Sequence, residues 1–184
     1  MNASTSDMSD TSDRTPQQTA ERVRERMYAN DPAVRGLGID VTEVAPGQAT
    51  VTMTVRGHML NGHATCHGGF LAALADTAFA YACNSYNELT VASGFSIDLV
   101  APAREGDLLT ARSFELSKAG RTGVYDSEIT NQHGERIAMF RGRSYTIKGK
   151  PAGAVATSST WPMATACSPA ASGPTTAPSA PAAR

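Results

Sequence analysis

A long helical segment, residues 67–84, constrains the fold more than any other part of this sequence. Between residues 70 and 83 it carries a single charged side chain, Asp76, and lacks the polar stripe that a surface helix presents to solvent. A helix that is apolar on every side is buried on every side. About 20 residues make a helix roughly 30 Å long, and six strands about 4.8 Å apart make a sheet roughly 24 Å wide. One helix is therefore expected to lie across a sheet that curls around it.

Alternating apolar and polar residues predict the strands of that sheet. Residues 48–55 place Val51, Met53 and Val55 on one face and threonines on the other. Residues 36–44 read as a shorter strand that pairs with them in a hairpin. Four more strands are expected, over residues 91–101, 107–117, 122–131 and 135–147.

The N-terminal part of the fold begins with a helix. Thr15 is a good N-cap, Pro16 suits the first helical position, and the helix is expected to run to Tyr28. The order of elements is then helix, two strands, helix and four strands. Short turns between strands favour antiparallel pairing, so the predicted class is α+β.

The two ends of the chain differ in composition from the rest. Residues 1–15 are mainly Ser, Thr, Asp and Met, and residues 150–184 are mainly Ala, Pro, Ser and Thr. Such segments bury too little apolar surface to offset chain entropy, which predicts disorder. The folded domain is therefore expected to span residues 16–149.

Charge and cysteine content restrict the possible partners and the compartment. The net charge of -1 gives no basic face of the kind that nucleic-acid binding needs. No apolar run approaches the roughly 20 residues that span a bilayer. The three cysteines, Cys66, Cys83 and Cys167, show no disulfide framework, and the N-terminus is polar and acidic, unlike a signal peptide. We expect a cytoplasmic protein that binds neither nucleic acid nor membrane.

Two features of the helical segment point to chemistry. Gly68 and Gly69 open it, and glycine there leaves backbone N–H groups bare at the positive end of the helix dipole, where an oxygen ligand can approach. The neighbours of Asp76 one turn away offer no side-chain hydrogen bonds, so its carboxylate needs a partner from elsewhere. Each feature alone also fits a structural role, as a tight entry turn or a satisfied core carboxylate. Together they indicate acyl transfer to water.

Several motifs resemble the phenylacetic acid degradation thioesterases of the hotdog superfamily. The main ones are residues 61–63, 66–69 and 74–85, which hold Asn-Gly-His, Cys-His-Gly-Gly and the middle of the helix. Shorter stretches agree at residues 91–93, 97–98, 123–126 and 140–142. The resemblance covers about residues 20–148 and leaves the two tails outside it.

The resemblance implies a hotdog fold, a long central helix wrapped by a five- to six-stranded antiparallel sheet. It also implies dimers that join their sheets edge to edge, often paired into tetramers, with the active site at the dimer interface. In that site Gly68 supplies an N–H to the thioester carbonyl, Asp76 of the other subunit activates water or attacks directly, and Asn61 orients the water or the thioester. The implied reaction is hydrolysis of (hydroxy)phenylacetyl-CoA or a related aryl or medium-chain acyl-CoA in phenylacetate catabolism, without metal or redox cofactor.

The phosphates of CoA are expected to contact basic side chains near strand ends, namely Arg121, Arg141, Arg143 and Lys148, with Lys118 behind them. His67 matches the family motif, and bracing of the turn is the simpler role for it. The expected substrate-binding residues are His67, Gly69, Ser93, Arg121, Arg141, Arg143 and Lys148.

Other chemistries remain open from the sequence. His63, Cys66 and His67 resemble metal ligands, although a zinc site needs three or four and no second group lies nearby. Cys66 or Cys83 with His67 resembles a nucleophile and its base, but without an orienting third group. A hotdog enoyl-CoA hydratase or dehydratase, or a non-catalytic acyl-CoA-binding module, are the alternative functions.

Overall fold

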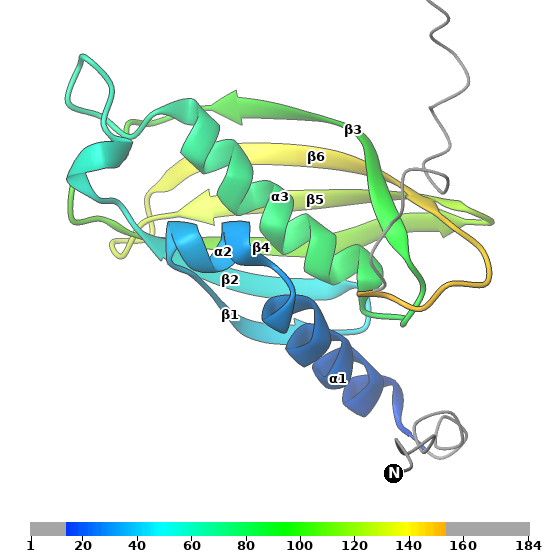
Figure 1. The fold of residues 1–184 in the computed structure, drawn as a ribbon. Helices are drawn as coiled ribbons and strands as arrows, with labels where there is room; N and C mark the ends of the chain where they lie inside the picture. Colours follow the sequence, from blue (N-terminus) through cyan, green and yellow to red (C-terminus); the bar gives the residue numbers. More distant parts are fainter. Residues whose placement is uncertain (1–13, 154–184) are drawn as a thin grey trace, which may run out of the picture. The chain divides into compact units, whose positions relative to one another are not determined.

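The long helix α3, Gly68–Asn84, lies across one antiparallel sheet (Figure 1). The computed structural model describes residues 14–153. The strands of the sheet are β1 Ile39–Ala45, β2 Gln48–Thr54, β3 Thr90–Leu99, β4 Leu108–Ala119, β5 Thr122–Thr130 and β6 Arg136–Thr146. Their order is β1-β2-β4-β5-β6-β3, and every neighbouring pair is antiparallel. The predicted α+β class is confirmed, with a helix wrapped by a six-stranded sheet.

Helix α1, Pro16–Ala29, begins as predicted. The side chain of Thr15 accepts the N–H of Gln18, and the side chain of Gln18 accepts the N–H of Thr15, which makes a capping box. Ala20 and Val23 are buried on the face of α1 that packs against β1. The predicted disordered tails, residues 1–15 and 150–184, lie outside the described residues except at 14–15 and 150–153.

A short helix, α2, Pro32–Leu37, precedes the first strand. Asp31 caps it by accepting the N–H of Val34 at 3.1 Å, and Gly38 ends it in the left-handed region with φ +67°. The expectation of a strand from residue 36 was therefore wrong at its start, because the chain leaves the helix only after Gly38. From Ile39 onward the predicted hairpin with β2 is confirmed.

Helix α3 buries one face against the sheet and leaves another partly open. The buried positions are Leu71, Leu74, Ala75, Ala78, Phe79, Tyr81, Ala82, Cys83 and Asn84. The expectation that α3 is buried on every side was wrong for the single chain. A stripe along α3 is only partly covered by the described residues, and it consists of Gly69, the adjacent pair Ala72 and Ala73, Asp76 and Ala80, at helical intervals of three or four residues.

Strand β3 is an edge strand that runs beside α3 in the opposite direction. Among the strands of residues 14–153, it pairs with β6 alone. At one end, the side chain of Asn84 donates to the Thr90 carbonyl and accepts the Thr90 N–H. At the other end, Leu99 lies against Gly68. The far edge of β3 therefore keeps its backbone groups available to another strand.

Candidate active site

The first turn of α3 contains an N–H group without a partner. His67 is the N-cap, and its Nδ1 accepts the N–H of Gly69 at 3.1 Å. The carbonyl of His67 accepts the N–H of Phe70 at 2.9 Å. Within residues 14–153 the N–H of Gly68 has no hydrogen-bond acceptor. This N–H lies at the positive end of the helix dipole, where an oxygen ligand is stabilised.

The loop before α3 holds that turn in place. The Oδ1 of Asn61 accepts the N–H groups of His63 at 2.9 Å and Thr65 at 3.3 Å, and its Nδ2 lies 3.0 Å from the Thr65 hydroxyl. The N–H of Cys66 donates to the Ala103 carbonyl, and that of His67 donates to the Met59 carbonyl, both at 2.8 Å. Asn61 therefore folds the loop that delivers Gly68.

Gly68 has a packing reason as well as a chemical one. A Cβ at this position would lie 2.8 Å from Cδ1 of Leu99, so any larger residue displaces that side chain. Leu99 is absent from the site residues that the sequence predicts. The sequence around Leu99 does not indicate a role in the site. Its contact with Gly68 depends on the path of β3 past the start of α3, which a local sequence pattern does not reveal.

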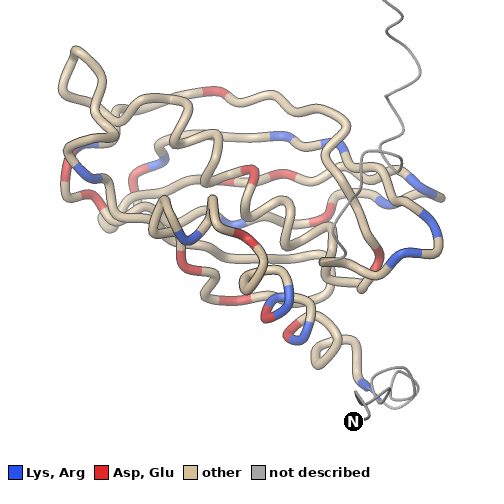
Figure 2. Tube along the Cα trace, viewed as in Figure 1, with Lys and Arg blue, Asp and Glu red and all other residues tan. Residues whose placement is uncertain are grey.

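Asp76 is a charged residue inside an otherwise uncharged helix. Figure 2 shows α3 as an almost entirely uncharged segment, with Lys, Arg, Asp and Glu gathered on other elements. The Oδ1 atom of Asp76 is buried and has no hydrogen-bond partner among the described residues. Burial raises the pKa of this carboxyl above its ordinary value. A carboxylate of this kind is a stronger base than one in water.

Gly68 and Asp76 are separated along the same helix. Eight residues at about 1.5 Å each place them roughly 12 Å apart along its axis. One thioester carbonyl cannot contact both groups within a single chain. The structure thus brings Asn61, His67 and Gly69 to Gly68, and places Asp76 two turns away.

The thiols near the site are poorly suited to nucleophilic attack. Burial raises the pKa of Cys66. Burial, and secondly the charge of Asp76, raise the pKa of Cys83 to about 12. A cysteine attacks as its thiolate, so both side chains are protonated near neutral pH. Their role as small apolar core residues fits the structure better.

Two of the predicted phosphate ligands lie on the sheet face opposite α3. Arg141 and Arg143 alternate along β6 with the buried residues Phe140 and Gly142, which face the helix. Arg141 donates two hydrogen bonds to the carboxylate of Asp126, at 2.6 and 2.7 Å. That pair is exposed, so Arg141 is available to solvent on the outer face.

The remaining predicted basic residues, Lys118, Arg121 and Lys148, lie at the end of the sheet that holds the β4–β5 turn. Arg121 donates to the Thr146 carbonyl and lies 4.5 Å from the ring centre of Tyr145. Lys118 pairs with Glu88 at 2.8 Å, and Lys148 follows β6. This end adjoins the C-terminus of α3, far from Gly68 in the same chain.

Ser93, the remaining predicted contact, lies on β3. Its hydroxyl donates to the carbonyl of Arg143 at 3.1 Å, across a bulge in the β3–β6 pairing. It is exposed along the same edge strand.

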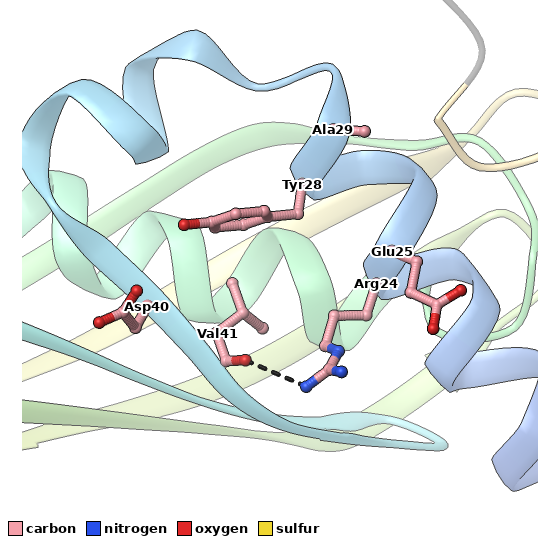
Figure 3. Close-up of a pocket in the computed structure, with 6 residues that line it drawn as sticks. All are labelled: Arg24, Glu25, Tyr28, Ala29, Asp40 and Val41. Atoms are coloured by element: carbon pink, nitrogen blue, oxygen red, sulfur yellow. Dashed lines mark hydrogen bonds between the residues drawn. The ribbon is translucent and has the colours of Figure 1, made fainter.

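Of two hollows in the described chain, one of about 300 Å³ on the outer sheet face includes Arg141 in its lining, and the other lies away from the predicted site residues. A hollow of about 440 Å³ between α1 and β1 is lined by Arg24, Glu25, Tyr28, Ala29, Asp40 and Val41, none of them a predicted site residue (Figure 3). Residues 14–153 hold no group of three or more His, Cys, Asp or Glu placed to bind a metal ion. Within the same range no helix is both long enough and apolar enough to cross a membrane.

Comparison with known proteins identifies the family. Residues 63–138, which include the start of α3 and Asp76, match the thioesterase superfamily model. The chain is 52% identical to acyl-coenzyme A thioesterase PaaI of Escherichia coli (strain K12) over 123 residues, covering 67% of this chain and 88% of that protein. The chain belongs to the thioesterase superfamily. This thioesterase is therefore an enzyme, and the resemblance seen in its sequence is confirmed.

Solved structures agree with this assignment and confirm the hotdog fold. The E. coli PaaI protein from the phenylacetic acid degradation operon superposes on this thioesterase with a TM-score of 0.73 at 48% identity, covering 74% of this chain and 99% of that one. A hypothetical thioesterase of Streptococcus pneumoniae TIGR4, solved with coenzyme A, gives a TM-score of 0.57 at 25% identity, covering 59% and 87%. The alternatives of a hydratase or a non-catalytic module find no support in these matches.

Proposed function

We propose that this thioesterase hydrolyses (hydroxy)phenylacetyl-CoA, or a related aryl or medium-chain acyl-CoA, to the free acid and CoA, and that it serves phenylacetate catabolism. The observation that carries the proposal is the presence, on one helix, of a Gly68 N–H and a buried Asp76 Oδ1 that both lack hydrogen-bond partners within residues 14–153. The relation to PaaI of E. coli supports the acyl-CoA substrate and the pathway.

Hydrolysis in this site uses the two groups in complementary roles. The Gly68 N–H donates a hydrogen bond to the thioester oxygen and stabilises the negative charge that develops on it. Asp76 accepts a proton from water as the water oxygen attacks the carbonyl carbon. The tetrahedral intermediate then collapses, the C–S bond breaks, and the CoA thiolate takes up the proton. In a second route the Asp76 carboxylate attacks the carbonyl carbon, the C–S bond breaks and CoA leaves as its thiolate. Water then cleaves the resulting anhydride to the free acid and the Asp76 carboxylate, and the proton released goes to the thiolate.

A complete site requires two chains. Because Gly68 and Asp76 lie roughly 12 Å apart along α3, the carbonyl held by one Gly68 meets Asp76 of the partner subunit. We propose that two β3 edges pair to form this dimer, since β3 has a free edge and flanks α3. Two dimers are expected to form a tetramer. The stripe of α3 around Asp76 would then be covered by the other subunit.

Mixing two inactive variants tests the shared site. In a hybrid of Gly68→Pro with Asp76→Asn, one site carries both changes and the other carries neither. Random reassociation should restore about a quarter of the wild-type activity. No recovery after exchange of subunits, verified by mass spectrometry of the mixed dimer, would show that one chain supplies both groups.

Asn61 is proposed to orient the water or the thioester. One of the two N–H groups on its Nδ2 is directed to Thr65, and the amide has a second to donate. An Asn61→Asp variant keeps the acceptor bonds to the N–H groups of residues 63 and 65 and loses both donors, while the Thr65 hydroxyl can still donate to it. It should therefore keep the loop and lose activity.

Arg121, Arg141, Arg143, Lys148 and Lys118 are proposed to contact the phosphates of CoA, with Ser93, Gly69 and His67 nearer the thioester. Single Arg→Gln changes should raise KM for an acyl-CoA and leave KM for the matching N-acetylcysteamine thioester, which lacks phosphates, unchanged. The reaction is balanced by the protein groups alone, so we propose no metal or redox cofactor. A cytoplasmic location and a domain of residues 16–149 complete the proposal.

A thiol-release assay tests the function directly. Phenylacetyl-, hydroxyphenylacetyl-, benzoyl- and medium-chain acyl-CoA are compared by kcat/KM, with the Asp76→Asn variant as the matched blank. The aryl-acetyl esters should be turned over fastest. Preference for a short linear acyl group would contradict the proposed substrate, and absence of turnover with all four would contradict acyl-CoA hydrolysis.

A further inference from the structure

Strand β3 presents large apolar side chains on the sheet face that α3 covers. Phe95 pairs with Gly142, and Ile97 pairs with the buried Phe140, so these residues share the inner face. Phe95 is nevertheless 46% exposed, and Leu99, on the same face, is 54% exposed. An aromatic ring on the inner face of an edge strand, left open by its own chain, is available to a ligand or a partner.

The ring of Phe95 is held in a fixed position. It stacks on Phe140 with a centroid distance of 4.9 Å and an interplanar angle of 30°. Phe140 lies 5.9 Å from Phe79, which lies 5.4 Å from Tyr125. This row of rings runs from the open edge into the core, so one side of Phe95 is packed and the other remains open.

The contacts at the two ends of α3 and β3 indicate that Phe95 lies near the level of Asp76. The helix α3 and the strand β3 run beside each other, with Asn84 joined to Thr90 at one end and Gly68 against Leu99 at the other. Phe95 is near the middle of β3 and Asp76 near the middle of α3. Phe79, one turn after Asp76, belongs to the row of rings that supports Phe95.

We propose that Phe95 forms a wall of the acyl pocket and selects flat aromatic acyl groups over short linear ones. This inference rests on the proposed function and specifies the substrate class of the same site. An aryl group attached to a carbonyl beside Asp76 can stack on the open side of Phe95. A two-carbon acyl group has no ring to stack on Phe95, and a linear chain gains only apolar contact.

The test compares three substrates across three variants. For Phe95→Ala we expect kcat/KM for phenylacetyl-CoA to fall about 10- to 100-fold, from the loss of ring contact, while acetyl-CoA changes less than about threefold. Hexanoyl-CoA should fall by an intermediate factor. Phe95→Leu, which keeps apolar bulk, should restore hexanoyl-CoA turnover more fully than phenylacetyl-CoA turnover.

Phe114→Ala is the matched control. Phe114 is 43% exposed, close to Phe95, but it alternates along β4 with the buried residues Ala111 and Ser113, so it faces away from α3. Phe114 and Arg141 line one hollow on that outer face, so removal of the Phe114 ring acts on the three CoA esters alike and should leave the ratios among their rates unchanged. Light scattering of each variant checks the assembly, because a variant that fails to associate loses all substrates equally.

The outcomes separate this inference from the proposed function. If the wild type is active and Phe95→Ala assembles normally, an unchanged ratio of phenylacetyl-CoA to acetyl-CoA turnover overturns the role of Phe95 alone. If Phe95→Ala does not assemble, the same ratio is read from Phe95→Leu. A wild type inactive on every acyl-CoA overturns both. A selective loss for phenylacetyl-CoA with the assembly intact supports the aromatic wall.

Discussion

The Nδ1 atom of His67 lies 3.1 Å from the backbone nitrogen of Gly69 and accepts its hydrogen bond. This bond fixes the first turn of α3 and satisfies the N–H of Gly69, whereas the neighbouring N–H of Gly68 has no acceptor among the described residues. An imidazole protonated on both nitrogens cannot accept it. His67 is therefore a positioning residue for the N–H that we assign to the thioester oxygen.

Replacing His67 separates bracing from chemistry. His67→Ala removes the cap and should lower the free energy of unfolding by about 1 kcal/mol. His67→Asn supplies another capping acceptor and should recover both stability and activity. Urea denaturation and thiol release measure the two effects. An Asn variant as stable as wild type but inactive would assign the imidazole a direct chemical role.

Replacing Gly68 by proline removes its N–H while keeping the helix. Gly68 is the first residue of α3, where proline is well tolerated, and the extended backbone of His67 suits a following proline. Gly68→Pro should lower kcat about 10²- to 10³-fold, the usual effect of losing one oxyanion donor. Gly68→Ala makes the same contact with Leu99 but keeps the N–H, so it should retain much more activity. Equal losses in the two variants would attribute the effect to Leu99.

Asp76 should dominate the pH dependence of the reaction. Asp76→Asn should lower kcat by about 10²- to 10⁴-fold, the usual contribution of a general base. Since burial raises the pKa of this carboxyl, kcat/KM of the wild type should fall with decreasing pH at a higher pH than an ordinary aspartate gives. The residual activity of Asp76→Asn should lack that limb. If activity falls at the same pH in the wild type and in Asp76→Asn, the acidic limb belongs to the titration of another group.

The same carboxylate should reduce the stability of the fold. Below the ordinary pKa of an aspartate both the folded and the unfolded states hold the proton, and the burial of Asp76 has no ionic penalty. As pH rises toward the raised folded pKa, the unfolded state ionises first, so stability falls. Asp76→Asn should therefore have a higher Tm than wild type at about pH 7, and the gain should shrink near pH 4. Thermal unfolding at both values checks the sign, and a gain that grows on acidification would contradict it.

Gly142 leaves room for the ring of Phe79, which lies one turn after Asp76 on α3. A Cβ at Gly142 would lie 2.9 Å from the ring of Phe79 and 3.0 Å from that of Phe140. Gly142→Ala should lower the free energy of unfolding by about 1–3 kcal/mol, as overpacking of a core does. Gly36→Ala, in α2 with open space around it, is the control and should be neutral or stabilising. Denaturant midpoints for both variants measure the difference.

Local signals were enough to predict most of the fold. Thr15 and Pro16 mark the start of α1, and alternation marks β2, because caps and strand faces depend on neighbours in sequence. Helix α2 was missed because Gly36 lies inside it, where glycine usually argues against a helix. The start of β1 depends on Gly38, whose left-handed backbone the sequence alone does not reveal.

The site was predictable in its residue types and less so in its contacts. Asp76 stands out in the sequence because nothing near it carries charge. The partly open stripe around Asp76 could not be predicted from the sequence. Alanines at these positions are equally compatible with cover by a strand, a helix or a second chain. The exposure of Phe95 is likewise a consequence of strand order, which places β3 at an edge.

That strand order has a consequence for synthesis of the chain. Thr90 pairs with Thr146, and Leu99 pairs with Ala138, so β3 has no neighbour until β6 has left the ribosome. Until then the apolar surface of α3 in the nascent chain is not fully covered by the sheet. Exposed apolar surface of this kind is bound by chaperones and cleaved by proteases. A message truncated before β6 would therefore yield a product that the cell degrades rather than a weakened enzyme.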